Sequence, residues 1–213
     1  MFELSKEMEN YILNQADRQD ELLYELYRET HKKVLHPRML SGRLQGQMLE
    51  LISKMLSPSR ILEIGTYTGY SAICLARGLA AGGQLDTIEI NDELEDFIRH
   101  YLNRSGLQEN ISLHIGDALE VLDQLQGPYQ LIYIDGDKRE YPDYLERCTK
   151  LLAPGAALLV DNVLWDGKVL DRNTRDAHTQ GIQQFNEMVT KDPSLESLIL
   201  PIRDGLMMAV KKQ

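Results

Sequence analysis

Residues 60–71, RILEIGTYTGYS, are the stretch that decides the fold predicted by this sequence. Ile61, Leu62 and Ile64 are typical of a buried strand. Gly65 and Gly69 then predict a tight turn, and the apolar residues that follow recur at helical spacing. The stretch therefore predicts a strand, a loop and a helix that belong to an α/β sheet.

The loop of this unit predicts a binding site for a small ligand. Its glycines let backbone N–H groups approach a ligand, and the start of a helix favours a carboxylate or phosphate. The spacing is Glu63-x-Gly65-x-x-x-Gly69, with Tyr67 where a dinucleotide fingerprint needs its second glycine, and no P-loop Gly-Lys-Ser/Thr follows. The pattern resembles the cofactor loop of S-adenosylmethionine-dependent methyltransferases of the Rossmann-like class. The alternative is a turn that only joins a strand to a helix.

The composition is typical of a globular protein with one α/β domain. The chain has 213 residues, 43% of them hydrophobic, and no apolar run approaches the roughly 20 residues that span a membrane. The first residues, MFELSKEMEN, lack the pattern of a secretion signal, so we expect a cytoplasmic protein. Cys74 and Cys148 lack C-x-x-C spacing and are expected to be buried free thiols. The net charge of −10 argues against a general binder of nucleic-acid phosphates.

The order of elements predicts a parallel sheet covered on both faces. Apolar spacing predicts one or two amphipathic helices between Leu4 and Val34, with packing or dimerisation as their role, and Pro37 and Gly42 predict a bend that serves as a lid. Strands are expected at residues 60–64, 84–88, 111–115, 130–134, 156–160, 195–202 and 206–210. Helices are expected at residues 70–80, 92–105, 118–125, 141–152 and 175–190. Residues 1–57 then form the N-terminal helices and lid, and residues 58–213 form the core.

An acidic residue follows or ends each of the first five predicted strands, where open parallel sheets bind ligands. These residues are Glu63, Glu89, Asp117, Asp135 and Asp161. Like charges that converge repel one another, so we attribute the set to function. Glu89 is placed to bind ribose hydroxyls, with a place beside a helix N-terminus as the alternative. Asp117 is either a partner for the exocyclic amine of adenine or a helix N-cap.

Asp135, Asp161 and Asn162 predict a site for a divalent cation. If the fourth and fifth strands are neighbours, their ends lie roughly 5 Å apart and these oxygen ligands converge. Hard oxygen ligands suit Mg²⁺, Mn²⁺ or Ca²⁺, and the absence of His and Cys from the set argues against zinc. Lys138, three residues after Asp135 in IDGDKREY, is a candidate general base for a hydroxyl. Carboxylates that cap loops and a surface lysine are the alternatives.

Several separated motifs together carry a more specific resemblance. In order they are ILEIGTYTGYS, TIEIN, GDA, YIDGDKREY and LLVDNVLWDGKV. From about Pro37 to Val210 the chain resembles the cation-dependent O-methyltransferases, which include catechol and caffeoyl-coenzyme A O-methyltransferases. The resemblance implies a single methyltransferase domain with a Rossmann-like, doubly wound, seven-stranded, mostly parallel sheet whose last strand is antiparallel.

The same resemblance implies the site residues and the reaction. It places S-adenosylmethionine against Ser41, Glu63, Gly65, Thr66, Ser71, Glu89, Asp117, Ala118 and Asp135. It makes Asp135, Asp161 and Asn162 the metal ligands, with Mg²⁺ as the expected cation, and Lys138 the catalytic base. The implied reaction is methyl transfer to a hydroxyl of a small catechol-like or other vicinal-oxygen acceptor, by a homodimer.

Two other functions stay open from the sequence. Related bacterial proteins include tRNA-modifying members, so the acceptor is alternatively a hydroxyuridine in tRNA; His36, Arg38 and Arg43 near the lid would then matter, although the net charge of −10 counts against RNA. A nucleoside-binding protein without catalysis is the other alternative. Lys138 and the set of two acids and an amide argue against it, because binding alone does not need them.

Overall fold

The computed structural model describes residues 5–16 and 20–213. Leu4 and residues 17–19, which fall within the predicted N-terminal helical stretch, lie outside the described residues. Within the described chain, α1 (Lys6–Gln15) and α2 (Glu21–Lys33) form two helices, as the apolar spacing predicts. Ser5 and Asp20 cap them by accepting hydrogen bonds from Met8 N and Leu23 N.

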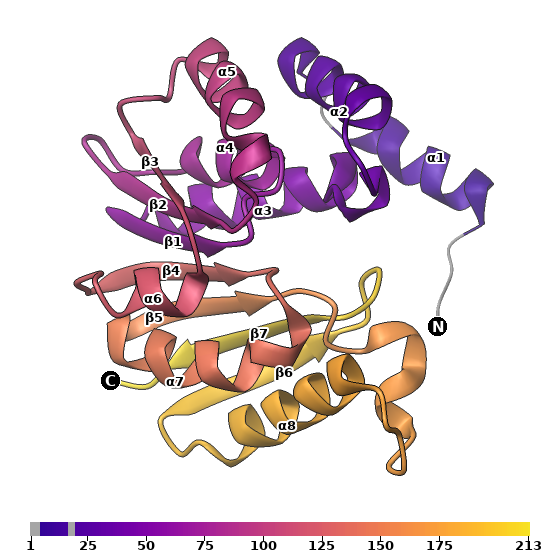
Figure 1. The fold of residues 1–213 in the computed structure, drawn as a ribbon, viewed down its shortest axis with the longest axis vertical. Coiled ribbons are helices and arrows are strands. Elements are labelled where there is room, and N and C mark those ends of the chain that lie inside the picture. Colours follow the sequence, from indigo (N-terminus) through magenta and orange to yellow (C-terminus); the bar gives the residue numbers. More distant parts are fainter. Residues whose placement is uncertain (1–4, 17–19) are drawn as a thin grey trace.

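The described residues form one seven-stranded sheet with the order β3-β2-β1-β4-β5-β7-β6 (Figure 1). Its strands are β1 (Arg60–Ile64), β2 (Gln84–Glu89), β3 (Ile111–Ile115), β4 (Tyr129–Ile134), β5 (Leu152–Val160), β6 (Leu195–Leu200) and β7 (Leu206–Lys211). The pairs among β1 to β5 are parallel, and β7 is antiparallel to both β5 and β6. This arrangement confirms the predicted fold class, including the antiparallel last strand.

The strand register brings the carboxyl ends of the central strands to one edge. Ile64 at the end of β1 pairs with Ile88 of β2 and with Ile134 of β4, and Ile134 pairs in turn with Val160 of β5. Asp135 and Asp161 follow directly after this last pair. The sheet therefore places their side chains at neighbouring strand ends, as the sequence predicts.

Helices cover both faces of the sheet (Figure 1). The helices α3 (Gly42–Leu56), α4 (Tyr70–Ala76) and α5 (Glu95–Ser105) share one apolar cluster with α2. The helices α6 (Ala118–Leu122), α7 (Tyr141–Leu151) and α8 (Ala177–Lys191) share the other. Four 3₁₀ segments of the described chain, η1 (Pro37–Met39), η2 (Asp92–Leu94), η3 (Lys138–Glu140) and η4 (Trp165–Leu170), lie between these elements.

Several predicted boundaries differ from the structure: α6 ends at Leu122, not at residue 125, and α8 begins at Ala177, not at residue 175. Three further boundaries were wrong because tertiary packing and turns override the apolar spacing. The α4 helix ends at Ala76, not at residue 80, and a Cβ on Gly78 would lie 2.3 Å from Ser53 Oγ of α3. The β5 strand begins at Leu152, and its register against β4 shifts near Gly155, which has a φ of 76°. The β6 strand ends at Leu200, because residues 201–205 form the turn of the predicted hairpin.

Cys74 and Cys148 are buried and unpaired, as predicted. Burial raises the pKa of both thiols, that of Cys148 to about 12, so neither is a reactive thiolate. No helix in the described ranges combines the length and hydropathy needed to cross a membrane.

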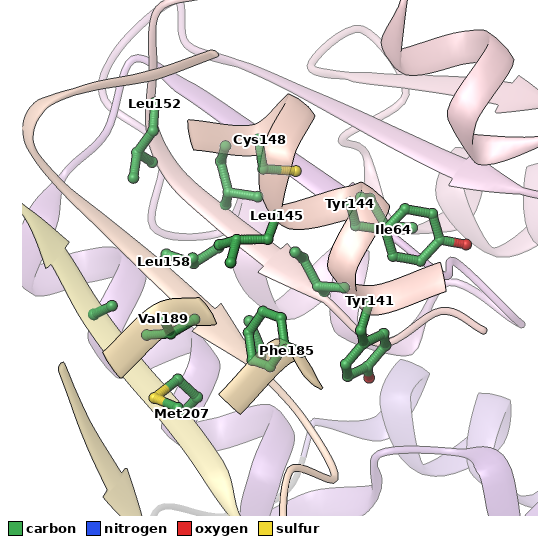
Figure 2. Packing of buried hydrophobic residues seen from close by; sticks show 14 of the residues in the cluster. Ile64, Tyr141, Tyr144, Leu145, Cys148, Leu152, Leu158, Phe185, Val189 and Met207 are labelled. Atoms are coloured by element: carbon green, nitrogen blue, oxygen red, sulfur yellow. The ribbon is translucent and has the colours of Figure 1, made fainter. Parts of the chain in front are cut away.

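The apolar cluster under α7 and α8 reaches the predicted site. Figure 2 shows the ring of Tyr141 beside that of Phe185, and their centroids lie 5.5 Å apart in an edge-to-face contact. Both side chains are fully buried, and Leu145 and Leu158 belong to the same cluster. The Tyr141 hydroxyl donates to the backbone oxygen of Asp161 at 2.9 Å. A rigid part of the core thus holds the end of β5.

Candidate active site

A pocket of about 1060 Å³ opens at the carboxyl edge of the sheet. Of the predicted site residues it is lined by Ser41, Gly65, Thr66, Ser71, Glu89, Ala118, Asp135, Lys138, Asp161 and Asn162. Glu63 and Asp117 do not line it. Its volume is at the upper end of the range for small-molecule sites, so it has room for two ligands side by side.

The glycine loop at the start of α4 is held mainly by its own backbone. Gly65 N and Thr66 N both donate to Ile88 O, and Tyr67 N donates to Glu89 Oε2 at 2.6 Å. These loop N–H groups are therefore already engaged. Ser71, in the first turn of α4, lines the pocket, and the start of a helix favours a negatively charged group of a ligand.

Gly65 is required by close packing as well as by its backbone angle. Its φ is 97°, and a Cβ at this position would lie 2.3 Å from the backbone oxygen of Asp135. Tyr67 also has a positive φ, of 51°, which is unfavourable for a bulky residue. Its hydroxyl donates to Leu35 O at 2.9 Å, so the loop is tied to the segment that precedes the lid.

Glu63 lies behind the pocket and is fully buried. Thr87 Oγ1 donates to its Oε2 at 2.6 Å, whereas Oε1 has no hydrogen-bond partner among the described residues. Burial raises the pKa of Glu63 to about 7, and the hydroxyl groups of Ser71 and Thr87 offset this only in part. The Glu63 carboxylate thus lies behind the residues that line the pocket and does not reach a ligand there.

Glu89 lines the pocket where an acid at the end of β2 is expected. Its Oε2 accepts from Tyr67 N and its Oε1 from Asn91 N at 2.9 Å. A carboxylate accepts about four hydrogen bonds, so Glu89 keeps acceptor capacity for a hydroxyl donor. Burial raises its pKa despite these backbone hydrogen bonds. The alternative, a place beside a helix N-terminus, is confirmed, since Asn91 caps η2 beside Glu89; the ribose-binding role stays a prediction.

Asp117 caps a helix. Its Oδ1 accepts from Leu119 N at 2.9 Å and from Glu120 N at 3.2 Å, which makes it the N-cap of α6. The structure therefore confirms the N-cap role, which was one of the two roles expected for Asp117. Ala118, the next residue, lines the pocket, as does Gly116.

Asp135 and Lys138 form an ion pair at the floor of the pocket. Lys138 Nζ donates to Asp135 Oδ1 at 2.7 Å and to Gly136 O at 3.1 Å, and the two side chains are only 12% and 18% exposed. Burial favours the neutral amine, but the Asp135 carboxylate and Tyr141 outweigh it and hold the pKa of Lys138 above its usual value. Lys138 is therefore an ammonium in this state.

Asp161 and Asn162 complete the oxygen set. Asp161 is buried, and burial, followed by the charge of Asp135, raises its pKa to about 6. Asn162 lines the same pocket and has a φ of 58°, a conformation that asparagine tolerates better than most residues. Among the described residues no three His, Cys, Asp or Glu side chains group as a metal site, so the candidate ligands here are two carboxylates and one amide.

These residues fit a divalent cation. Two carboxylates face one pocket, and the charge of Asp135 adds to the effect of burial in raising the pKa of Asp161. A bound cation would remove this repulsion, and carboxylate and amide oxygens are the ligands that Mg²⁺ and Ca²⁺ prefer. Asp135, Asp161 and Asn162 would hold it.

The lid and an aromatic wall close the remaining sides. Residues 36–41, which include η1, line the pocket at the predicted bend. On another side the ring of Trp165 stacks on His178 at 6.2 Å with an interplanar angle of 19°. Trp165 also packs against the core below it. His178 and His36 also line the pocket.

Two polar residues beside the acidic set were not predicted from the sequence. Gln45 of α3 donates to Asp161 Oδ2 at 2.6 Å, and Arg203 of the β6–β7 hairpin donates to Gln45 Oε1. A signal for Gln45 was present in the sequence. It lies on one stripe of α3 with Leu49 and Ser53, and a polar residue on a buried stripe needs a buried partner. Arg203 carries no comparable signal.

Comparisons with known proteins agree with this geometry. The sequence matches the O-methyltransferase family over residues 13–212. A catechol O-methyltransferase from Niastella koreensis is 34% identical over 79% of this chain and 80% of that protein. A caffeoyl-CoA O-methyltransferase from Stellaria longipes is 29% identical over 95% of this chain and 89% of that protein.

A solved structure gives the same result. The crystal structure of an O-methyltransferase from Bacillus cereus in complex with SAH matches with a TM-score of 0.91 and 33% identity, over 95% of this chain and 96% of that one. The family match over residues 13–212 and these relatives show that the chain belongs to the O-methyltransferase family and is an S-adenosylmethionine-dependent O-methyltransferase of the catechol and caffeoyl-CoA type.

Proposed function

We propose that this enzyme transfers the methyl group to a hydroxyl of a small acceptor with two vicinal oxygens, such as a catechol, and that it requires a divalent cation. One observation carries the proposal. The carboxylates of Asp135 and Asp161 and the amide of Asn162 line one pocket together with Lys138, whose ammonium contacts Asp135.

Asp135, Asp161 and Asn162 would hold the cation, with Mg²⁺ as the first candidate. When bound, a divalent cation supplies Lewis acidity, which orients two vicinal oxygens and stabilises the negative charge that develops on one of them. The residues of this chain fix the position of that charge. Tyr141 holds the backbone of Asp161, and the strand ends are fixed by the pairing of β4 with β5.

Lys138 is the proposed general base. Asp135 Oδ1 is the oxygen that it contacts, and the charge of Asp135 is the main influence that keeps it protonated. Asp135 therefore pairs either with the Lys138 ammonium or with a cation. Once its charge is shared with a cation, burial becomes the dominant influence and favours a neutral amine, which can accept a proton from the acceptor at Nζ.

The two ligands of the reaction would occupy different parts of the pocket. The S-adenosylmethionine side is proposed at Gly65, Thr66, Ser71, Glu89 and Ala118, with Ser41 above it. Glu89 has lone pairs for the ribose hydroxyls, and the start of α4 suits the carboxylate of the methionine part. Trp165 and His178 form an aromatic wall of the pocket, against which an aromatic acceptor would pack.

Methyl transfer from S-adenosylmethionine to a panel of catechols and to bulk tRNA, each with Mg²⁺ and with a chelator, tests the proposal. We expect methylation of at least one catechol with Mg²⁺ and its loss with the chelator. Labelling of tRNA with inert catechols would replace the proposed acceptor by a tRNA hydroxyuridine. The net charge of −10 makes that the less favoured outcome, because RNA binding depends on basic surfaces.

We also propose that the enzyme is a homodimer formed through its N-terminal helices. Leu51 and Met55, one turn apart on α3, are 57% and 77% exposed, and Tyr24 on α2 is 51% exposed. Exposed apolar side chains of this size favour a protein partner when they are grouped. Sedimentation velocity at micromolar concentration would give a dimer if this is correct, and a monomer would contradict it.

A further inference from the structure

Gln45 is a buried polar side chain beside the proposed cation site. It is 2% exposed and lies in the first turns of α3. Its Nε2 donates to Asp161 Oδ2 at 2.6 Å and to the hydroxyl of Tyr133 at 2.8 Å. Both protons of this amide nitrogen are therefore used, and one of them is given to a proposed metal ligand.

Arg203 fixes the orientation of the Gln45 amide. Its Nη1 donates to Gln45 Oε1 and, at 2.5 Å, to the backbone oxygen of Ser41. If the amide were turned over, its oxygen would face the carboxylate of Asp161 and its NH₂ group would face the guanidinium. Both contacts would then be repulsive, so Arg203 and Asp161 together permit one orientation.

We propose that Gln45, oriented by Arg203, is a positioning residue for the cation site, and this inference rests on the proposed function. The hydrogen bond to Oδ2 restricts the rotation of the Asp161 carboxylate and so fixes the direction of its remaining lone pairs, which a cation would use. Because glutamine is neutral, it does this without cancelling the negative charge that attracts the cation. A lysine or arginine in the same place would hold the carboxylate at the expense of that charge.

The experiment compares Mn²⁺ affinity, measured by isothermal titration calorimetry on the full chain, for the wild type and Gln45→Met. Methionine has a similar length and no N–H donor. Partners that orient a metal ligand typically contribute 10- to 100-fold in affinity, so we expect Mn²⁺ to bind at least about 10-fold more weakly to the variant. A wild type and variant that bind Mn²⁺ equally would overturn the inference and leave the proposed function intact. A wild type that binds no Mn²⁺ would overturn both.

A matched control separates positioning from general loss of stability. Ser53→Ala removes a buried hydrogen bond from the same helix, because Ser53 Oγ donates to Leu75 O at 2.7 Å. This variant is expected to unfold more easily and to keep the Mn²⁺ affinity of the wild type. If it weakens Mn²⁺ binding as much as Gln45→Met does, the role of Gln45 is only to hold α3 in place, and the inference is wrong.

A double-mutant cycle tests the role of Arg203. Arg203→Ala removes a contact to Gln45 and also removes a positive charge near the cation site. If Arg203 acts through the Gln45 amide, Arg203→Ala changes the Mn²⁺ affinity of the wild type by a certain factor. In the Gln45→Met background the same substitution then has no effect or the opposite effect. If it acts only through its charge, the factor is the same in both backgrounds, and the orienting role is excluded.

Discussion

Lys138 shows how one side chain depends on the charge of its neighbour. Its ammonium pairs with Asp135, and that pairing holds its pKa above the usual value against the effect of burial. The amine becomes a base only when Asp135 has another partner. At the scale of single residues, the chemistry of this site therefore depends on whether the Asp135 carboxylate pairs with the Lys138 ammonium or with a cation.

Substituting Lys138 tests this competition. We expect Lys138→Met to lower kcat by about 10²- to 10⁴-fold, the usual contribution of a general base. Cation affinity should rise in the same variant, because Asp135 loses its competing ammonium. Lys150→Met, at an exposed position of α7, is the matched control and should change neither quantity. A Lys138→Met enzyme with normal kcat would exclude Lys138 as the base.

Glu63 predicts a pH dependence of stability. Burial raises its folded-state pKa to about 7 from an ordinary value of 4.5, so the folded state binds more protons than the unfolded state between these values. Its contribution to stability is therefore fully present below pH 4.5 and is lost as the pH rises to about 7. Over this window the free energy of unfolding should fall by about 3 kcal/mol on account of Glu63 alone.

Urea denaturation of the ligand-free wild type and Glu63→Gln between pH 5 and pH 8 measures this effect. Asp161, whose pKa is also raised by burial, contributes a fall of the same sign over a lower window in both proteins. The difference between the two curves therefore isolates Glu63. We expect Glu63→Gln to be the more stable protein at pH 8 and the advantage to shrink towards pH 5. Parallel curves would show that Glu63 is ionised in the folded protein throughout.

At the scale of elements, the contact of α8 with η3 fixes the backbone that carries Lys138. A Cβ at Gly181 of α8 would lie 2.3 Å from Lys138 O and 2.9 Å from the Cα atom of Arg139. Neither atom is the end of a flexible side chain, so the helix and the segment must separate if the residue is enlarged. Gly181 is thus a packing requirement of the site, although it lines no part of the pocket.

Gly181→Ala should accordingly lower both stability and activity. Forcing extra volume into a packed contact costs about 1 to 3 kcal/mol, measurable as a lower free energy of unfolding. The displaced Lys138 backbone should lower kcat more than it raises KM. Gln184→Ala, on the exposed side of the same helix, is the control and should leave both unchanged. Full activity in Gly181→Ala would mean that the position of η3 does not matter.

The elements also show what the sequence can predict. Buried strands, glycine turns and acids at strand ends are local patterns, so β1 and β3 were predicted to the residue, and Asp135, Asp161 and Lys138 were expected in one place. The end of α4 and the start of β5 were wrong because they depend on packing against α3 and β4.

The contacts between distant segments were not predictable in this way. Gln45 and Asp161 are 116 residues apart in the sequence, and Arg203 lies 158 residues beyond Gln45. Only the folded sheet brings α3, β5 and the β6–β7 hairpin together. Asp117 illustrates the opposite case, because its capping role is local and was one of two roles expected from the sequence.

At the scale of the whole molecule, the residues that stabilise the fold and the polar residues of the pocket lie in different places. The parallel strands end at one edge, the two apolar clusters hold the helices against both faces, and the polar groups of the pocket gather where the strands stop. The lid comes from the N-terminal part and the Arg203 hairpin from the C-terminal part, and the contact of Arg203 with Ser41 joins them. Both ends of the chain thus contribute to one site.

Methyl transfer measured against Mg²⁺ concentration, for the wild type and Asp161→Ala after removal of bound metal with a chelator, tests the central claim most directly. Asp143→Ala, an exposed acid in the first turn of α7, is the control. The account predicts that Mg²⁺ restores activity to the wild type and the control, whereas Asp161→Ala stays at least about 100-fold less active. Full methyl transfer by Asp161→Ala without added cation would contradict the account.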